Sequence, residues 1–450
     1  MRKRADTSLD QHLHGFWRAN GSPRRLIVAV SGGSDSMAVL VAARRLHASG
    51  VMVRAVTIDH GLRPESAREA EQVASWARTI SIPHETRIWQ GAKPVSGLQA
   101  AARRARYQLL AEAAADVGAG AIVTGHTEDD QIETFLMRMA RGNATGGLAG
   151  MAPIRPIAAG AGPVADLWRP FLGVSREVLR AYLGAGGQAF IDDPSNEDER
   201  FERVRVRNWL RGEQVCPDED ASSPFKRDDL VSSLRRAQEE AERTRAIEDH
   251  LFRQQGGVIY QWGGIGIRLS FLTDPSAKGL TGRLIHAVSG ADYPPSPDQI
   301  DHLLSHLEEG QCRESMTGYK ASLGGVLIEV RPEDLIFYRE PAQLIGRAGI
   351  APAADTPMPS GSSLLWDRRF IVTNNGASEV VLAVLGEQQQ ISQDFQKVPL
   401  YPLHLTPGAA RAALPALKTS RSEADGNALR RQVYVQPLVR ERFFDGVIRF

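Results

Sequence analysis

Six consecutive small polar residues form the segment of this sequence best suited to chemistry. They are Ser31-Gly32-Gly33-Ser34-Asp35-Ser36, which stand between a short apolar run and a helical pattern. Glycines let the backbone approach an anion, and the first N–H groups of the following helix point at such a loop with the positive end of the helix dipole. The hydroxyls can donate to phosphate oxygens, and Asp35 can contact a magnesium ion that bridges phosphates. The segment therefore predicts a phosphate-binding loop rather than a turn with a simple N-cap.

A second polar group follows another apolar run and opens a helical pattern. It consists of His126, Asp129, Asp130 and Glu133. Asp130 and Glu133 are three residues apart and so share one helix face. Two carboxylates there can hold the ammonium group of an amino acid or a magnesium ion. Alternatively, the acidic residues only cap the helix with Thr127, and His126 is an ordinary loop histidine.

Arginines cluster at two places, although the net charge of the chain is only +1. The first cluster, at 103–106, lies in a helical pattern and is either a solvated face or a contact for an anion. In the second, Arg203, Arg205 and Arg207 alternate, so an extended segment would present all three on one side. Such a row suits an RNA backbone or an unstacked base, and we predict it as an RNA contact, with a solvated strand edge as the alternative.

Alternating strand and helix patterns position these groups. Apolar runs predict four strands, each followed by a helical pattern, at residues 25–30, 51–59, 84–89 and 119–125. This alternation predicts an α/β domain with a doubly wound parallel sheet. The strands are almost wholly apolar, as expected for a sheet covered on both faces. The loop and the acidic group then both lie at the carboxyl ends of strands, where α/β proteins bind ligands.

Smaller helical and α+β domains are predicted to follow this nucleotide domain. The further predicted elements are a hairpin over 153–174, a helix over 175–183, a linker over 211–229, helices over 229–255 and 298–309, and a hairpin turning at 331–334. A Pro/Gly/Ser-rich stretch at 351–363 precedes a module of short strands. We predict domains at 1–212, 213–350 and 351–450.

Composition excludes several classes of protein. Hydrophobic residues make up 42% and charged residues 24% of the chain, the balance of a globular protein. No run of about 18 apolar residues predicts a membrane span, and the basic N-terminus lacks the apolar core of a secretory signal. Two cysteines, Cys216 and Cys312, are too few for a disulfide framework or a four-cysteine zinc site. These features predict a cytoplasmic protein, and they leave a homodimer open.

The loop is neither a Walker A loop nor G-x-G-x-x-G. It resembles the pyrophosphatase loop of the N-type ATP pyrophosphatases, which cleave ATP between the α and β phosphates and adenylate a carbonyl oxygen. Within that group, five further segments resemble the tRNA(Ile)-lysidine synthetases, and they stand in the same order, at 58–63, 101–107, 124–134, 141–151 and 193–207. Two departures are Thr127, where these enzymes usually have a second histidine, and Val204, where they often have asparagine.

The resemblance implies an adenine nucleotide alpha hydrolase-like fold and a defined reaction. Lysine would be ligated to C2 of the wobble cytidine in the CAU anticodon of tRNA(Ile), with ATP and Mg²⁺ as cofactors and tRNA(Ile) and free lysine as partners. It implies that residues 31–36 bind the nucleotide, that Asp35 contacts the metal and that the C-terminal modules bind tRNA. The residues with implied catalytic roles are Asp35, Arg106, His126, Asp130 and Glu133.

Another adenylating enzyme with the same loop is the alternative. Sulfur-transferring tRNA enzymes need reactive cysteines near the loop or an iron–sulfur cluster, and no cysteine precedes Cys216. Amide-forming synthetases that use glutamine need a nucleophilic cysteine or an ammonia-donating partner. Within this second kind, neither GMP synthetase nor NAD synthetase accounts for the arginines at 201–211.

Overall fold

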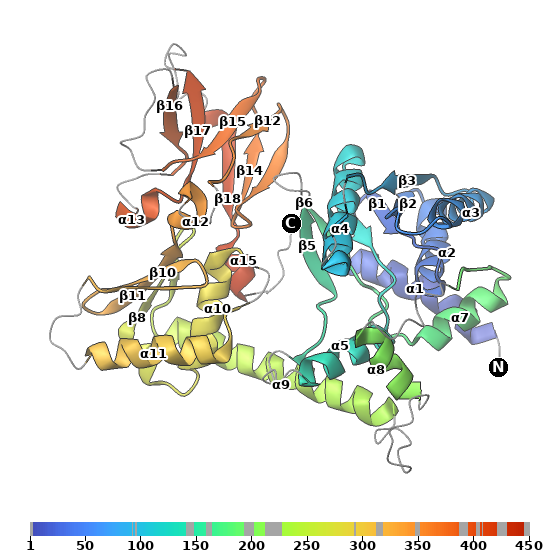
Figure 1. Cartoon of the computed structure of the whole chain (residues 1–450), viewed down its shortest axis with the longest axis horizontal. Coiled ribbons are helices and arrows are strands. Elements are labelled where there is room, and N and C mark those ends of the chain that lie inside the picture. Colours follow the sequence, from blue (N-terminus) through green and yellow to red (C-terminus); the bar gives the residue numbers. More distant parts are fainter. Residues whose placement is uncertain are drawn as a thin grey trace. The chain divides into compact units, whose positions relative to one another are not determined.

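A computed structural model of the 450-residue chain divides into two compact units (Figure 1). The first unit contains Met1–Ala159 and Val164–Thr244, and the second is mainly Arg245–Arg449. The predicted division into three domains stays a prediction. The structure describes all residues except 1–2, 92, 95–96, 141–147, 159–163, 193–201, 212–226, 292–293, 312–317, 347–351, 387–394, 402–405, 407, 421–429 and 445–450.

The first unit is built on a six-stranded sheet in the order β3-β2-β1-β4-β6-β5. Its strands are β1 (Arg25–Ala29), β2 (Met52–Asp59), β3 (His84–Ile88), β4 (Ala121–Val123), β5 (Ile154–Ala158) and β6 (Val164–Trp168). All neighbours pair in parallel except β5, which forms an antiparallel hairpin with β6. The predicted doubly wound parallel sheet and the predicted hairpin are both confirmed.

The helices of this part of the chain are α1 (Lys3–Ala19), α2 (Ser34–Ala48), α3 (Ser66–Thr79), α4 (Leu98–Val117), α5 (Glu128–Ala140), α7 (Arg176–Ala185), α8 (Glu202–Arg211) and α9 (Arg227–Gln254). They pack on the sheet or on one another, as α8 and α9 do on α5. The chain runs outward through α2 and α3, then returns through α4 to β4. Right-handed crossovers therefore put α4 on the face opposite α2 and α3. On that face, Leu110 packs with Ile27, Ile122 and Leu167 in a core without solvent exposure.

One prediction for the first unit is wrong. Arg203, Arg205 and Arg207 lie in helix α8 rather than in an extended segment. The reason is that Val206 and Leu210, four residues apart, pack into the core beneath α5, and this spacing is helical. On a helix, residues two apart do not share a face, so Arg205 and Arg207 point in different directions.

The described part of the second unit contains three sheets and several helices. Its sheets have the orders β7-β8-β11-β10-β9, β12-β15-β17-β16 and β13-β14-β18. Their strands are β7 (Val258–Ile259), β8 (Ile265–Arg268), β9 (Lys320–Leu323), β10 (Val326–Val330), β11 (Asp334–Arg339), β12 (Thr356–Met358), β13 (Ser363–Trp366), β14 (Phe370–Asn374), β15 (Val380–Val384), β16 (Phe395–Pro399), β17 (Pro415–Ser420) and β18 (Val433–Pro437). The helices are η2 (Leu269–Thr273), α10 (Ala277–Ser289), α11 (Pro297–Gln311), α12 (Ala342–Ile345), α13 (Gly408–Arg411) and α15 (Val439–Phe444).

The sequence located several of these elements. The predicted helices over 229–255 and 298–309 correspond to α9 and α11, and the hairpin turning at 331–334 is formed by β10 and β11. Most of the predicted linker, residues 212–226, lies outside the described residues. Among the helices that the structure describes, none combines the length and the apolar character needed to cross a membrane.

Candidate active site

The loop at 31–36 leads from β1 into α2. Gly33 is the N-cap of α2 and, as a glycine, offers no side chain to cap this helix end. The N–H groups of the first turn therefore remain for an external acceptor. Gly32 has a φ of +91°, and a Cβ atom there would lie 2.8 Å from Cδ1 of Ile191. This position thus requires glycine, and the loop presents bare backbone as an anion site does.

The serine hydroxyls of the loop bond mainly within the loop. Ser36 Oγ accepts from the Ser31 N–H at 3.1 Å and donates to the Gly33 carbonyl at 3.0 Å. Ser34 Oγ donates to Oδ1 of Asp35 at 3.0 Å. These bonds hold the loop in shape, so backbone N–H groups are its main donors to a phosphate.

The turn after β4 lies directly against this loop. A Cβ atom on Gly125 would stand 2.6 Å from the backbone carbonyl of Asp35, so only glycine allows this approach. Thr124 Oγ1 lies 2.8 Å from Nδ1 of His126, which orients the imidazole beside the loop. The parallel order of β1 and β4 thus brings the two sequence motifs to one edge of the sheet.

A single arginine joins the carboxylates of the two motifs. Arg176, the first residue of α7, donates from Nε to Oδ2 of Asp35 at 2.8 Å. Its other guanidinium nitrogens lie 3.5 Å from Oδ1 of Asp130 and 3.9 Å from Oε1 of Glu133. The structure therefore places Asp35, Asp130 and Glu133 around one cation.

Glu133 is the most deeply buried carboxylate of the group, with 2% of its surface exposed. Arg207 of α8 donates from Nε and Nη2 to Glu133 Oε1, both at 2.9 Å. Oε2 of Glu133 is buried and has no hydrogen-bond partner among the described residues. The pair explains why α8 packs on α5, and it leaves one carboxylate oxygen for a further donor.

Asp130 and Asp129 also organise the start of α5. Asp130 Oδ2 accepts from the backbone N–H of Thr127 at 2.8 Å, as in a helix-capping arrangement. Asp129 Oδ2 accepts from the backbone N–H of Arg176 at 2.7 Å, and Oδ1 accepts from Arg227 at 2.8 Å. The capping role considered for these carboxylates is therefore real, but Asp130 Oδ1 still faces Arg176.

Burial sets the protonation of these carboxylates. It raises the pKa of the Asp35 carboxyl, and the nearby Arg176 guanidinium offsets this only in part. Burial also raises the pKa of Glu133, against the opposing hydrogen bond from Arg207. At Asp129 burial acts in the same direction, but hydrogen bonds from Arg227 and from the Arg176 N–H outweigh it and lower the pKa. Asp35 and Glu133 are thus the carboxylates that most need a cation.

The remaining predicted site residues lie on helices α4 and α8. Arg106 is exposed on α4, and its charge contributes, after burial, to lowering the pKa of His60 at the end of β2. Arg205 is exposed on α8, whereas Arg207 is engaged by Glu133. The side chain of Arg203 lies outside the described residues, as do the segments 141–147 and 193–201 of two of the motifs.

Sequence reasoning missed Arg176, which stands at the centre of the site. The helix it begins has Ser175 as N-cap, with Ser175 Oγ accepting from the Val178 N–H. A cation in a first helical turn opposes the helix dipole. An arginine at this helix end needs acidic partners from other parts of the chain. Its unfavourable position at the positive end of the helix dipole was the signal available in the sequence.

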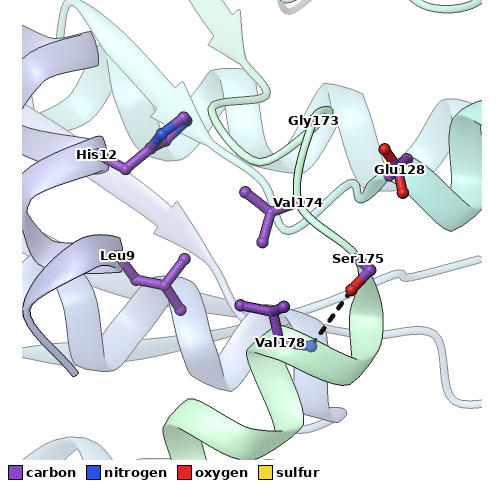
Figure 2. A pocket seen from close by; sticks show the side chains of 7 residues that line it. All are labelled: Leu9, His12, Glu128, Gly173, Val174, Ser175 and Val178. Carbon is purple, nitrogen blue, oxygen red and sulfur yellow. Dashed lines mark hydrogen bonds between the residues drawn. The ribbon is translucent and has the colours of Figure 1, made fainter. Parts of the chain in front are cut away.

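A pocket of about 340 Å³ lies beside this site rather than within it. Figure 2 shows Leu9 and His12 of α1 on one side, Val174 and Val178 between, and Glu128 opposite. None of Asp35, Asp130 and Glu133 lines it. Among its polar groups, Glu128 is paired with Arg227 at 3.1 Å and His12 Nε2 lies 2.7 Å from the Pro170 carbonyl oxygen. We therefore assign the chemistry to the carboxylate cluster and not to this pocket.

The donor set suits a magnesium ion that is completed by a substrate. Within the described part of the chain, no group of three or more histidine, cysteine or acidic residues could by itself hold a metal. Magnesium commonly takes one or two carboxylates, water and substrate phosphates. Asp35 fits the role of such a carboxylate ligand, because it lies in the first turn of α2 and its burial makes a neighbouring cation favourable.

Known proteins resemble this chain both within the first unit and beyond it. The family model described as the PP-loop domain matches residues 4–214. The tRNA(Ile)-lysidine synthase of Rhizobium meliloti is 36% identical over 82% of this chain and 77% of its own length. The chain belongs to the tRNA(Ile)-lysidine synthase family. The resemblance seen in the loop and the five ordered segments is thereby confirmed, and the PP-loop match supports the use of ATP.

Other lysidine synthases match over a similar extent. That of Hyphomonas neptunium is 39% identical over 68% of this chain and 78% of its own length. Among solved structures, a U34-tRNA thiolase from Methanococcus maripaludis is 13% identical, with a TM-score of 0.38, over 48% of this chain and 72% of that chain. The matches to lysidine synthases reach into the second unit.

Proposed function

We propose that this protein ligates lysine to C2 of the wobble cytidine in the CAU anticodon of tRNA(Ile), forming lysidine, AMP and pyrophosphate. The observation that carries the proposal is the contact of Asp35 on the nucleotide loop, through Arg176, with the carboxylates Asp130 and Glu133. A nucleotide site and an amine site then adjoin, as a reaction that adenylates one substrate and transfers it to an amine requires.

In the first step, the C2 carbonyl oxygen of the cytidine attacks the α-phosphate of ATP and pyrophosphate leaves. The backbone N–H groups at the start of α2 would hold the phosphates, with Ser31–Ser36 as the binding loop. Asp35 would hold Mg²⁺, which supplies neutralisation of phosphate charge when it is bound. Arg106 on α4 and His126 in the turn after β4 would contact the nucleotide.

In the second step, the side-chain amine of lysine attacks the adenylated C2 carbon, the C2–O bond breaks and AMP leaves. Asp130 would orient the ammonium group before it loses a proton. Glu133 suits the acceptance of that proton because burial raises its pKa and Oε2 has no partner among the described residues. Arg207 would keep Glu133 in position.

We also propose a division of labour along the chain. Residues 1–212 would carry the chemistry, while 213–350 and 351–450 would bind the tRNA body. Arg203 and Arg205 on α8 would contact RNA near the reacting base. Because tRNA is the substrate, the cytoplasm is the expected location. The alternative, another PP-loop adenylating enzyme, remains distinguishable by its acceptor.

The test is ATP–pyrophosphate exchange with in vitro transcribed tRNA(Ile), scanned across free amino acids. We expect exchange that requires the tRNA with a CAU anticodon, and incorporation of lysine alone. Incorporation of sulfur or of ammonia instead of lysine would favour the alternative enzyme class. Exchange without any tRNA would contradict adenylation of cytidine. Sedimentation of the same preparation measures whether the protein is a homodimer.

A further inference from the structure

Three arginines that the reaction above does not use converge on one tyrosine of the first unit. Tyr107 lies on α4 and is buried. The guanidinium carbon of Arg103, one turn earlier, lies 5.0 Å from its ring centroid, and that of Arg155 on β5 lies 5.4 Å away. Arg155 is opposite Leu167 in the β5–β6 register, so Arg169, two residues beyond Leu167, projects toward the same face.

This cluster carries positive charge without a balancing carboxylate. None of the three arginines forms an ion pair with an acidic residue in the part of the chain that the structure describes. Arg169 is only 4% exposed, and its Nη1 donates to the Ala152 carbonyl at 2.6 Å. Nε of Arg169 and Nε of Arg155 are both buried, and neither has a hydrogen-bond partner among the described residues. Buried donors of this kind normally have acceptors.

The charges act on one another as expected for such a cluster. Burial lowers the pKa of Arg169, and the charges of Arg155 and Arg103 lower it further. Tyr107 is also buried, which favours its neutral form, yet Arg103 and Arg169 are close enough to lower the pKa of its phenol. An anion placed among these groups would relieve both effects.

The cluster lies beside the adenylation site. The carbonyl of Trp168 accepts from the backbone N–H of Thr124 at 2.9 Å, so Arg169 follows directly on the strand that flanks the 124–126 turn. That turn presses against Asp35 through Gly125. Arg169 therefore lies next to the turn that contacts the loop proposed to hold ATP, at the carboxyl edge of the sheet.

We propose that Arg103, Arg155 and Arg169 form a phosphate-binding site next to the adenylation site. The planar fork of arginine matches phosphate oxygens, and stacking on Tyr107 holds two of the forks in place before the ligand arrives. Arg103 and Arg155 are partly exposed, so they can reach an incoming phosphate. Arg169 is buried and adds positive charge from the protein interior. The phosphate comes either from the RNA backbone beside the reacting cytidine or from ATP; the RNA source rests on the proposed function.

The test compares the double variant Arg103→Gln/Arg155→Gln with Arg54→Gln/Arg87→Gln in the full-length protein. The control removes the same charge from arginines already paired with Glu85. Affinities for in vitro transcribed tRNA(Ile) and for ATP are measured at several salt concentrations. If RNA is the source, tRNA affinity falls about tenfold and the slope of log affinity against log salt falls by roughly 1.4–1.8, with ATP affinity unchanged. If ATP is the source, ATP affinity falls instead.

Further arms keep the outcomes distinct. Arg103→Lys/Arg155→Lys keeps both charges, and we expect it to retain most of the salt slope. If tRNA and ATP affinities in the Gln variant both equal those of the control, the phosphate site is refuted while the proposed function stands. If the unmodified protein neither binds nor modifies tRNA(Ile), the proposed function fails, and the ATP measurement alone decides the site.

Discussion

At the scale of single residues, charge balance organises the candidate site. Arg176 lies among Asp35, Asp130 and Glu133. In the proposed reaction, the same carboxylates face two further cations, the magnesium ion of ATP and the ammonium group of lysine. Carboxylates on Asp35 and Glu133 are costly because both are largely buried. The magnesium ion and the lysine ammonium group would therefore neutralise these carboxylates together with Arg176 or in its place. Removing one carboxylate should then weaken the binding of the cation that it contacts.

Asp35→Ala is expected to abolish adenylation while leaving the fold intact. The change removes the proposed magnesium contact from a loop whose shape is held by Ser36 and Gly33 instead. We expect tRNA-dependent pyrophosphate exchange to fall by about a hundredfold or more, with an unchanged circular dichroism spectrum. Normal pyrophosphate release by the folded variant would contradict the assignment of the loop.

Asp130→Asn is expected to weaken the use of lysine more than the binding of ATP. Asparagine can still accept from the Thr127 N–H, so the helix cap survives while the charge facing the ammonium group is lost. KM for lysine should rise at least tenfold, with little change in the Kd for ATP. An unchanged KM for lysine together with weaker ATP binding would point to a metal-binding role for Asp130.

Asp166→Asn should stabilise the protein above neutral pH. Burial raises the pKa of Asp166 to about 6 from 3.8, and its Oδ1 has no partner among the described residues. Between these pH values the folded state binds a proton that the unfolded state lacks, so the stability this proton confers is lost as pH rises through about 6. At pH 7.5 the variant should gain on the order of 2 kcal/mol. Its melting temperature at pH 4 should match that of the unmodified protein; an equal gain at both pH values would refute the titration.

At the scale of elements, helix α8 directs neighbouring arginines to two different places, whereas an extended segment would present them on one side. Its apolar side packs on α5 through Val206 and Leu210, and Arg207 reaches Glu133 from the same helix. Arg205 points away and is exposed. Arginines two residues apart therefore serve different purposes, one inside the site and one on the surface.

The matched variants Arg205→Gln and Arg207→Gln test this separation. Arg205→Gln should weaken tRNA binding and lower its salt slope by about 0.7–0.9. Arg207→Gln removes the closest partner of a buried carboxylate and should cost about 1–3 kcal/mol in the free energy of unfolding. Urea unfolding and tRNA titration at several salt concentrations measure the two effects. Equal effects of both variants on RNA binding would mean that α8 acts as a uniformly basic surface.

At the scale of the whole molecule, the chain forms two compact units, each with its own core. All residues of the proposed ATP site belong to the first unit, which contains the six-stranded sheet. Ligand binding stabilises only the part of a protein that it contacts in the folded state. The two units should therefore respond differently to ATP.

Calorimetry should resolve two unfolding transitions, of which ATP with magnesium shifts only one. At a ligand concentration of 100 times Kd, the first unit should gain about 2.7 kcal/mol. The ATP-independent transition should remain when Asp35→Ala removes the shift. A single transition that moves as a whole with ATP would show that the two units unfold cooperatively.

The sequence by itself determined the strands of the first unit, the nucleotide loop and the acidic start of α5. These features depend on neighbours in the chain: apolar runs, glycines that allow close backbone approach, and carboxylates at helical spacing. The order of the motifs was enough to identify the family. In contrast, the helical state of Arg203–Arg207 was mispredicted because alternating charges outweighed the i, i+4 spacing of Val206 and Leu210.

Only the tertiary structure decided which charges meet. Arg176 and Asp35 are 141 residues apart, and Arg207 and Glu133 are 74 apart. No periodicity relates such positions, since their contact follows from strand order and helix packing rather than from local spacing. The same is true of Arg103, Arg155 and Arg169, which come from a helix, an edge strand and a strand end. Their convergence on Tyr107 exists only because the hairpin β5–β6 pairs beside β4 and beneath α4.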